Sequence, residues 1–253
     1  MAVRTICVPG KIFYTNGMIT TQGEAEKHVA TLRRKAGVDV ELHHNDTTPL
    51  EKLIVLFAKI SVGVVGLGYA IGSQKKTRRK RNFDLAIGIG SAGLLIWAYL
   101  DFREIQNRKI ASAELLAKKV AFYLEQNPLS QVTLVFHSQG AHIGCLALEK
   151  LAYLKDRIDV VTIGGMVNIP DHLANTVMNF QNDGDYISKV AQVFADHHPG
   201  RKIQYETKSQ QTGILKPHYT EDYFENSFIQ QLLKSSAQQR RYFVTTKGVF
   251  SAR

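Results

Sequence analysis

Apolar residues follow two different periods along this chain, and segments with the two periods alternate. Short runs of β-branched and aromatic residues, which are typical of strands, occur at residues 5–8, 11–14, 38–43, 132–136, 159–163, 174–180 and 202–207. Apolar positions three or four apart, which are typical of amphipathic helices, occur at residues 24–35, 111–125 and 220–235 and directly after residue 138. The alternation predicts an α/β protein with a mostly parallel sheet that helices cover on both faces.

Two long apolar segments interrupt this order. Residues 53–73 contain one charge, at Lys59, and residues 85–100 contain none. A membrane-spanning helix needs roughly 20 apolar residues, and Trp97 and Tyr99 stand near one end, where aromatic residues of a membrane interface are expected. The two segments therefore predict a membrane-inserted helical hairpin.

The hairpin divides the chain into two predicted domains. Residues 1–50 and 106–253 form a discontinuous α/β domain, and residues 51–105 form the hairpin with its connecting loop. Gly68 and Gly72 have the spacing of small residues at which two membrane helices pack. A soluble helical cap and a dimerisation arm are the alternatives. A hairpin that spans the bilayer and one that lies in a single leaflet both remain open.

The net charge of +10 is concentrated in the loop between the apolar segments. Residues 75–81 carry six Lys or Arg residues, and the rest of the chain has 26 such residues against 22 Asp and Glu, a balance of +4. A basic run without interleaved aromatic residues predicts contact with anionic lipid headgroups and no nucleic-acid partner. No secretory signal sequence is recognised, so a membrane localisation is expected to come from the hairpin.

Candidate chemistry is concentrated where residues 132–136 end. This strand leads into Ser138, and Gly140 follows at the start of a helix rich in small residues. A serine at a sharp strand-to-helix turn stands above the sheet, where backbone N–H groups can stabilise an oxyanion; this is a nucleophile elbow. The alternative is a serine that only caps a buried helix.

A serine nucleophile needs a base within hydrogen-bond reach and an acid that orients the base. Asp185, in the turn after residues 174–180, is the preferred acid, and Asp183 is the alternative. The same Asn-Asp-Gly-Asp sequence is also an ordinary turn signal. His218 is the preferred base because it lies in the loop between the last predicted strand and the helix at residues 220–235.

Other patterns indicate neither a metal nor a nucleotide cofactor. The His-His pairs at residues 43–44 and 197–198 have no further ligands at metal spacing, so no metal and no cofactor is predicted. Cys7 and Cys145 stand far apart in apolar segments, which predicts buried, reduced thiols. Residues 88–93 match the G-x-G-x-x-G pattern of dinucleotide sites, but they lie inside an uncharged run with no preceding turn, which favours helix packing.

The order of serine, acid and histidine, each placed after a strand, resembles that of the α/β-hydrolase superfamily of lipases, esterases and thioesterases. The resemblance covers the chain outside the hairpin and implies a minimal α/β-hydrolase-like fold. It also implies that Ser138 is the nucleophile, that His218 is the general base and then the acid, and that Asp185 orients the histidine.

The resemblance further implies an oxyanion hole made of backbone N–H groups. One donor would be Gln139, the residue after the nucleophile, and the other would be Gly17 or Met18 in the turn after an early strand. This sequence departs from the family's G-x-S-x-G motif at Phe136, where the family has glycine. In the early turn, Asn16 takes the place of the family's usual histidine.

These features predict a membrane-associated serine hydrolase that cleaves a carboxylic ester or thioester. A lipid-like substrate is expected because the hairpin would hold the catalytic domain beside acyl chains. The alternative is a catalytically inactive, membrane-anchored protein that uses the hydrolase fold as an interaction module. Reaction of Ser138 with a fluorophosphonate distinguishes the two.

Overall fold

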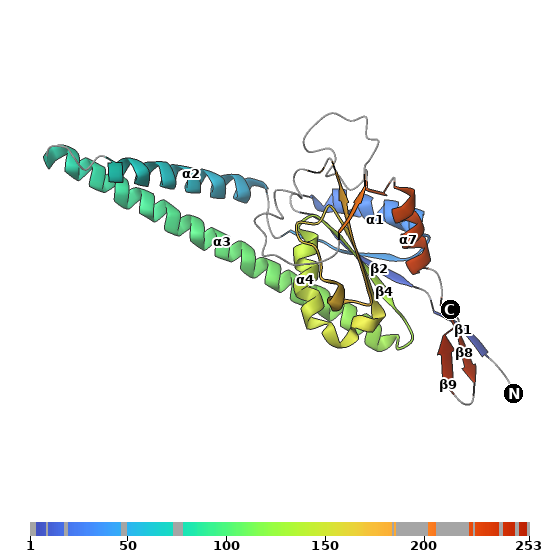
Figure 1. The fold of residues 1–253 in the computed structure, drawn as a ribbon. Helices are drawn as coiled ribbons and strands as arrows, with labels where there is room; N and C mark the ends of the chain where they lie inside the picture. Colours follow the sequence, from blue (N-terminus) through green and yellow to red (C-terminus); the bar gives the residue numbers. More distant parts are fainter. Residues whose placement is uncertain are drawn as a thin grey trace. The chain divides into compact units, whose positions relative to one another are not determined.

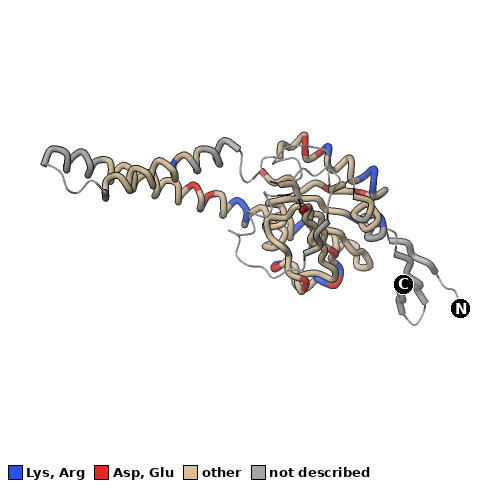
Figure 2. The backbone as a smooth tube through the Cα atoms, turned by 45° about the horizontal axis from the view of Figure 1, so that its top comes forward, with Lys and Arg blue, Asp and Glu red and all other residues tan. Residues whose placement is uncertain are grey.

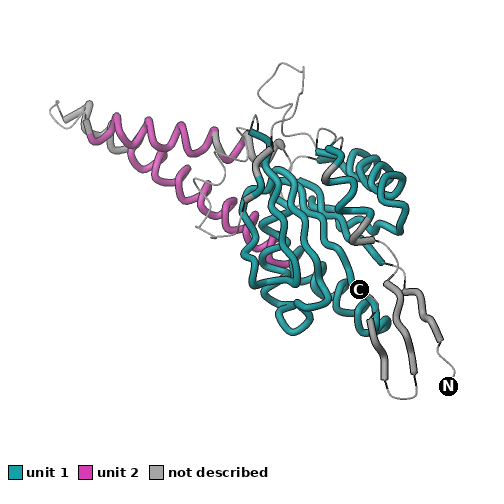
Figure 3. The backbone as a smooth tube through the Cα atoms, turned by 45° about the vertical axis from the view of Figure 1, so that its right-hand side comes forward, with its two compact units in different colours: residues 1–46, 112–253 teal, residues 47–111 magenta. Residues whose placement is uncertain are grey.

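A computed structural model describes residues 4–8, 10–17, 20–46, 50–72, 78–183, 185, 202–205, 223–224, 226–237, 240–245 and 248–251 of the chain. The chain divides into two compact units, which Figure 3 shows in different colours. Unit 1 comprises Met1–Asp46 and Ser112–Arg253, and unit 2 comprises Thr47–Ala111.

Unit 1 is built on a six-stranded sheet whose five strand pairings are all parallel (Figure 1). In spatial order the strands are β3 (Val40–His43), β2 (Lys11–Thr15), β4 (Val132–His137), β5 (Ile158–Ile163), β6 (Thr176–Asn182) and β7 (Lys202–Tyr205). The predicted α/β class with a parallel sheet is therefore confirmed, and six of the seven predicted strands lie in this sheet.

Helices cover both faces of this sheet, as predicted. The helical elements of unit 1 are α1 (Gln22–Ala36), α4 (Gly140–Lys150), α7 (Ser227–Ala237), the C-terminal part of α3 (Arg78–Gln126), and the 3-10 helices η1 (Ala152–Arg157) and η2 (Asp171–Leu173). Residues of α3 and α4 share one core with the sheet, and residues of α1 and α7 share the other. Figure 1 shows α1 and α7 on one face and α4 on the other.

Strand alternation explains how one sheet supports two cores. In β4, Val132, Leu134 and Phe136 belong to the core with α3 and α4, whereas Val135 belongs to the core with α1 and α7. Successive side chains of a strand point to opposite faces. All six residues of β4 are buried, so the strand that precedes Ser138 is fixed from both sides.

The predicted strand at residues 5–8 is confirmed, but it lies outside the six-stranded sheet. As β1 (Arg4–Val8) it pairs antiparallel with β8 (Arg240–Thr245), and β8 pairs antiparallel with β9 (Gly248–Ser251). A strand pattern specifies extended backbone but not the partner that completes its hydrogen bonds. The sequence reasoning also missed β8 and β9, which provide that partner sheet.

The helix predicted at residues 111–125 starts earlier than expected, because α3 is continuous over its 49 residues. Residues 101–110 contain neither Gly nor Pro, so nothing in their sequence ends a helix. Residues 88–93 lie inside this helix, so they do not form the turn of a dinucleotide site. The last predicted helix starts later than expected, at Ser227, where the Asn226 side chain accepts the Ile229 N–H at 3.2 Å.

In unit 2, α2 (Leu50–Gly72) and the N-terminal part of α3 pack against each other with opposite chain directions. A Cβ on Gly63 would lie 2.8 Å from Leu95, and one on Gly66 would lie 2.1 Å from the Ser91 hydroxyl, so both glycines stand at the contact. A Cβ on Gly68, which the small-residue spacing singled out, would meet nothing within 4 Å, so this glycine is not at the contact. Within the described part of the chain, no helix combines the length and apolar character needed to cross a membrane.

His43 is buried at the end of β3, with 3% of its surface exposed, and its Nε2 lies 2.9 Å from the Ser112 hydroxyl. Burial is the main cause that lowers the pKa of its imidazole to about 4, and the positive charge of Lys119 adds to the effect. The folded protein therefore holds this histidine neutral, whereas the unfolded chain protonates it near pH 6.5.

We predict that this difference makes the protein less stable in acid. The contribution of neutral His43 to the free energy of unfolding is complete above pH 6.5. It is lost as the pH falls towards 4, by about 3 kcal/mol in total. His43→Gln removes the titration, so chemical unfolding between pH 7 and 4 should show a flatter pH dependence than the wild type. The exposed His172 provides the control: His172→Gln should follow the wild-type curve. Equal slopes for His43→Gln and the wild type would contradict the prediction.

Candidate active site

The candidate residues lie at the carboxyl ends of neighbouring parallel strands. Gly17 follows β2, Ser138 follows β4, Gly164 follows β5 and Asp185 follows β6. Because β3 lies on one side of β2 and β4 lies on the other, the chain changes direction across the sheet between β2 and β4. Ligands of open α/β sheets bind outside the strand ends at such a switch point, which is where Ser138 stands.

Ser138 has φ 52°, and it is the single non-glycine residue with positive φ among the described residues. Left-handed backbone is costly for a side chain with a Cβ and persists where the surroundings impose it. Here the Ser138 N–H donates to the Ile163 carbonyl at 3.3 Å, and the Ser138 carbonyl accepts the Met166 N–H at 3.1 Å. β5 and the loop after it thus hold the turn between β4 and α4. Ser138 is buried in this turn, with 4% of its surface exposed.

Two glycines allow the turn after β2 to approach this serine. A Cβ on Gly17 would lie 2.8 Å from the Ser138 Cβ, and a Cβ on Gly140 would lie 2.6 Å from the Thr15 carbonyl oxygen. Both distances are shorter than real Cβ contacts, so each position requires glycine. The backbone of the predicted oxyanion turn is therefore adjacent to Ser138 and to the N-terminus of α4.

A buried amide network connects the two sides of the predicted oxyanion hole. The Asn16 Oδ1 accepts the Asn45 N–H at 2.7 Å, and the Asn45 Nδ2 donates to the Gln139 Oε1 at 3.0 Å. All three side chains are at most 3% exposed. The His44 Nδ1 also lies 3.1 Å from the Asn16 Oδ1, so this histidine joins the network beside Asn16. The sequence reasoning missed Asn45, whose only signal was a polar residue directly after a strand.

Asp185 and Asp183 differ in their surroundings. Asp185 is completely buried, and its Oδ2 accepts the Tyr223 hydroxyl at 2.8 Å. The same hydroxyl accepts the Asn182 N–H at 3.2 Å, so Tyr223 ties the carboxylate to the end of β6. Asp183 is half-buried. A buried, hydrogen-bonded carboxylate has the more fixed geometry, which favours Asp185 over Asp183 as the acid, and Tyr223 is a further residue that the sequence reasoning missed.

Gly164 lets Asp185 and Tyr223 stand close to β5. It has φ 55°, and a Cβ there would lie 2.9 Å from both the Asp185 Oδ2 and the Tyr223 hydroxyl. The carboxylate thus lies against the strand end next to that of Ser138. The predicted base His218 and the predicted oxyanion donor Met18 lie outside the described residues.

Phe136, the departure from the family's motif, is accommodated by a glycine on the following helix. Its ring is completely buried, and a Cβ on Gly144 would lie 2.5 Å from two of the ring carbons. The missing side chain at Gly144 therefore leaves the space that the ring fills. Strand β4 and helix α4, which flank Ser138, can therefore pack closely because the glycine of this contact, Gly144, stands on the helix.

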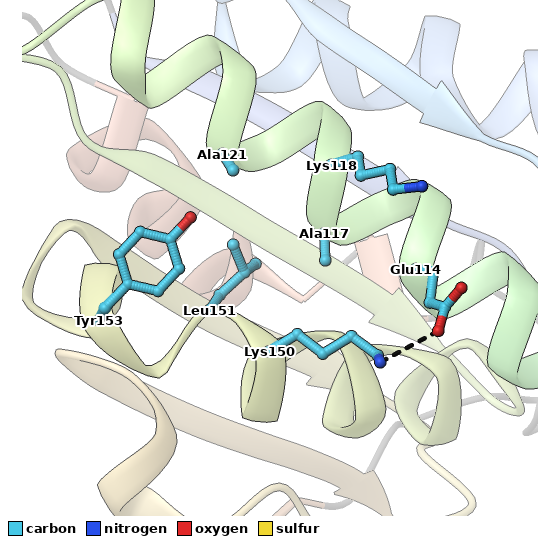
Figure 4. Close-up of a pocket in the computed structure, with 7 residues that line it drawn as sticks. All are labelled: Glu114, Ala117, Lys118, Ala121, Lys150, Leu151 and Tyr153. Atoms are coloured by element: carbon cyan, nitrogen blue, oxygen red, sulfur yellow. Dashed lines mark hydrogen bonds and ion pairs between the residues drawn. The ribbon is translucent and has the colours of Figure 1, made fainter.

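A surface hollow of about 380 Å³ lies in another part of unit 1 from Ser138 (Figure 4). It lies between α3 and the C-terminal end of α4, where the Lys150 Nζ is 3.2 Å from the Glu114 Oε1. An eleven-residue helix is about 16 Å long, so α4 separates this hollow from Ser138 at its other end. Among the described residues, no group of three or more His, Cys, Asp or Glu side chains could hold a metal ion.

We predict that Gly144→Ala destabilises unit 1. The added methyl group overlaps the buried Phe136 ring, which outweighs the better helix propensity of alanine, and the net loss in the free energy of unfolding should be about 1–2 kcal/mol. Phe136→Leu in the same chain removes the overlap and should restore part of the loss. Gly23→Ala in α1, where a Cβ meets nothing within 4 Å, is the control for propensity alone. Wild-type stability of Gly144→Ala would show that the ring does not need this space.

Comparison with the models of known protein families and with curated protein sequences finds no match to this chain. Its function is therefore inferred from its own residues. Three features carry this inference: the left-handed backbone of Ser138, the turn at Gly17 beside it, and the buried carboxylate of Asp185 after β6.

Proposed function

We propose that this chain is a membrane-associated serine hydrolase of the α/β-hydrolase superfamily, and that it cleaves a carboxylic ester or thioester with a lipid-like acyl group. One observation carries the proposal: Ser138 has left-handed backbone at the end of a buried parallel strand and at the N-terminus of α4. A serine in that position stands at the end of its strand, close to backbone N–H donors. A helix-capping serine does not require left-handed backbone, because an N-cap residue has extended backbone.

In the proposed reaction, the Ser138 Oγ attacks the carbonyl carbon of the substrate and His218 accepts its proton. The developing oxyanion accepts hydrogen bonds from the Gln139 N–H and from the N–H of Gly17 or Met18. The carbonyl re-forms, and the alcohol or thiol leaves with the proton from His218. His218 then takes a proton from water, and the hydroxide attacks the acyl carbon. The bond between this carbon and the Ser138 Oγ breaks, His218 returns its proton to Oγ, and the carboxylic acid leaves.

Asp185 orients the imidazole of His218 in this scheme and stabilises its positive charge. The hydrogen bond from Tyr223 to the Asp185 Oδ2 supports the assignment because it fixes the orientation of this buried carboxylate. In the sequence, His218 stands five residues before Tyr223, a stretch that spans at most about 18 Å when extended.

Membrane association is the second part of the proposal, and the surface of unit 2 supports it. The described stretches of α2 and of α3 up to residue 100 expose large apolar side chains, and Figure 2 shows these stretches mostly in tan, with the charged positions of α3 further along that helix. Soluble domains rarely expose apolar patches of this extent. An acyl substrate dissolved in the same membrane would be available to a hydrolase held there, which is the reason for the lipid-like substrate class.

A fluorophosphonate probe tests the catalytic part, because it phosphonylates a serine that is activated for attack. We expect the intact protein to be labelled and Ser138→Ala to show only background labelling, with an unchanged unfolding temperature. Ser227→Ala, at the exposed start of α7, should be labelled like the wild type. No labelling of the intact protein, or equal labelling of Ser138→Ala, would overturn the assignment and favour a non-catalytic interaction module.

Tyr223→Phe tests the role of the buried carboxylate. Loss of the 2.8 Å hydrogen bond removes the donor that fixes the buried carboxylate of Asp185, so the carboxylate should orient the imidazole of His218 less well. For a short-chain ester, kcat should fall about tenfold while KM stays close to the wild-type value. Tyr153→Phe is the control because Tyr153 is 69% exposed. A kcat equal to that of the wild type would exclude Asp185 as the acid that Tyr223 positions.

A further inference from the structure

The two helices of unit 2 expose apolar side chains on every side except the one where they pack against each other. Successive residues of a helix are about 100° apart, so the exposed Val62, Val64 and Val65 of α2 point three different ways. Within residues 55–71 and 87–102, the exposed large apolar residues are Val55, Ile60, Val62, Val64, Val65, Tyr69, Ile71, Ile89, Ile96, Trp97, Tyr99, Leu100 and Phe102. No exposed described residue within 55–71 or 87–100 is charged.

This distribution fits a lipid bilayer better than a second copy of the chain. A helix that packs in a soluble bundle buries one apolar stripe and keeps a polar face for water. Here the apolar residues leave no polar face between residues 55 and 71, so a protein partner on one side would leave the other sides exposed to water. The basic run at residues 75–81 complements the charge of anionic headgroups.

The charge at Lys59 is the obstacle to this placement, and α3 supplies its partner. The Lys59 Nζ lies 2.6 Å from the Asp101 Oδ2 and 3.9 Å from the centre of the Trp97 ring. The Lys59 side chain is 14% exposed and the Asp101 side chain 30%. The ammonium group is therefore enclosed between a carboxylate and an aromatic face, and the two helices meet at this point as a neutral pair.

We infer that the paired helices of unit 2 sit in the apolar layer of an anionic bilayer, and that Asp101 neutralises Lys59 there. This inference rests on the proposed membrane association and assigns it a residue-level requirement. A single charge within a membrane helix is costly, and such residues pair with one another where they occur. Removal of either partner leaves an uncompensated charge, whereas removal of both leaves none.

Trp97 reports on the inference directly, because it is the only tryptophan of the chain and contacts the pair. The full-length protein is mixed with vesicles of phosphatidylcholine and phosphatidylglycerol whose acyl chains carry bromine at defined depths. We expect the Trp97 emission of the wild type to shift to shorter wavelength and to be quenched by acyl-chain bromine. Asp101→Asn and Lys59→Met should each reduce vesicle binding about 100-fold.

The double variant Lys59→Met/Asp101→Leu should bind and be quenched like the wild type, which separates neutralisation from a general loss of folding. Glu104→Gln is the matched control, since it breaks the exposed Glu104–Arg108 pair of the same helix and should change nothing. A wild type that does not bind vesicles, or whose Trp97 emission shifts only through self-association, would overturn the membrane association itself. Wild-type binding by Asp101→Asn, or equal loss in the single and double variants, would overturn the pairing alone.

Discussion

Ser138 adopts a backbone conformation that costs a non-glycine residue on the order of 1 kcal/mol or more, and its neighbours hold it there. The N–H and the carbonyl of Ser138 are both bonded to β5 or to the loop after it, and Gly140 allows α4 to start against the end of β2. Because β4 is buried on both faces, the strand cannot rotate to release the strain. The position of the serine above the sheet follows from these contacts.

The same constraint explains why polar residues collect at this edge of the sheet. Parallel strands bring their carboxyl ends together, and β2, β3, β4 and β6 each end next to a buried polar residue of the site. Asn45 connects the turn that holds Asn16 to the side chain of Gln139, and Tyr223 connects Asp185 to the end of β6. Buried amide and carboxylate groups that have their hydrogen bonds satisfied make a site rigid, as catalysis by positioned donors requires.

Several elements could be predicted because their sequence signals are local. The buried run at residues 132–136, the serine and the following glycine specify the turn around Ser138 within a few residues. The sequence reasoning missed the continuity of α3, because the charged residues at 101–110 separate an apolar segment from an amphipathic one. The pairing of β1 was not predicted, because its partner β8 is more than two hundred residues away in the chain.

The contacts that were missed join residues with no periodic relation. Asn45 and Gln139 are 94 residues apart, and Tyr223 and Asp185 are 38 apart. The space for Phe136 depends on Gly144, one turn into the next helix, and a motif that fixes glycine before the serine gives no indication of it. Lys59 and Asp101 are likewise separated by the whole hairpin loop. Pairings of this kind become visible only when the elements are placed in space.

The most direct test of the central claim is a crystal structure of the protein after reaction with a phosphonate ester. The account predicts a covalent bond between phosphorus and the Ser138 Oγ, with the phosphoryl oxygen within hydrogen-bond distance of the Gln139 N–H and of an N–H in the turn after β2. An adduct on another residue would contradict the account. A phosphoryl oxygen directed into solvent, away from both backbone donors, would contradict it as well.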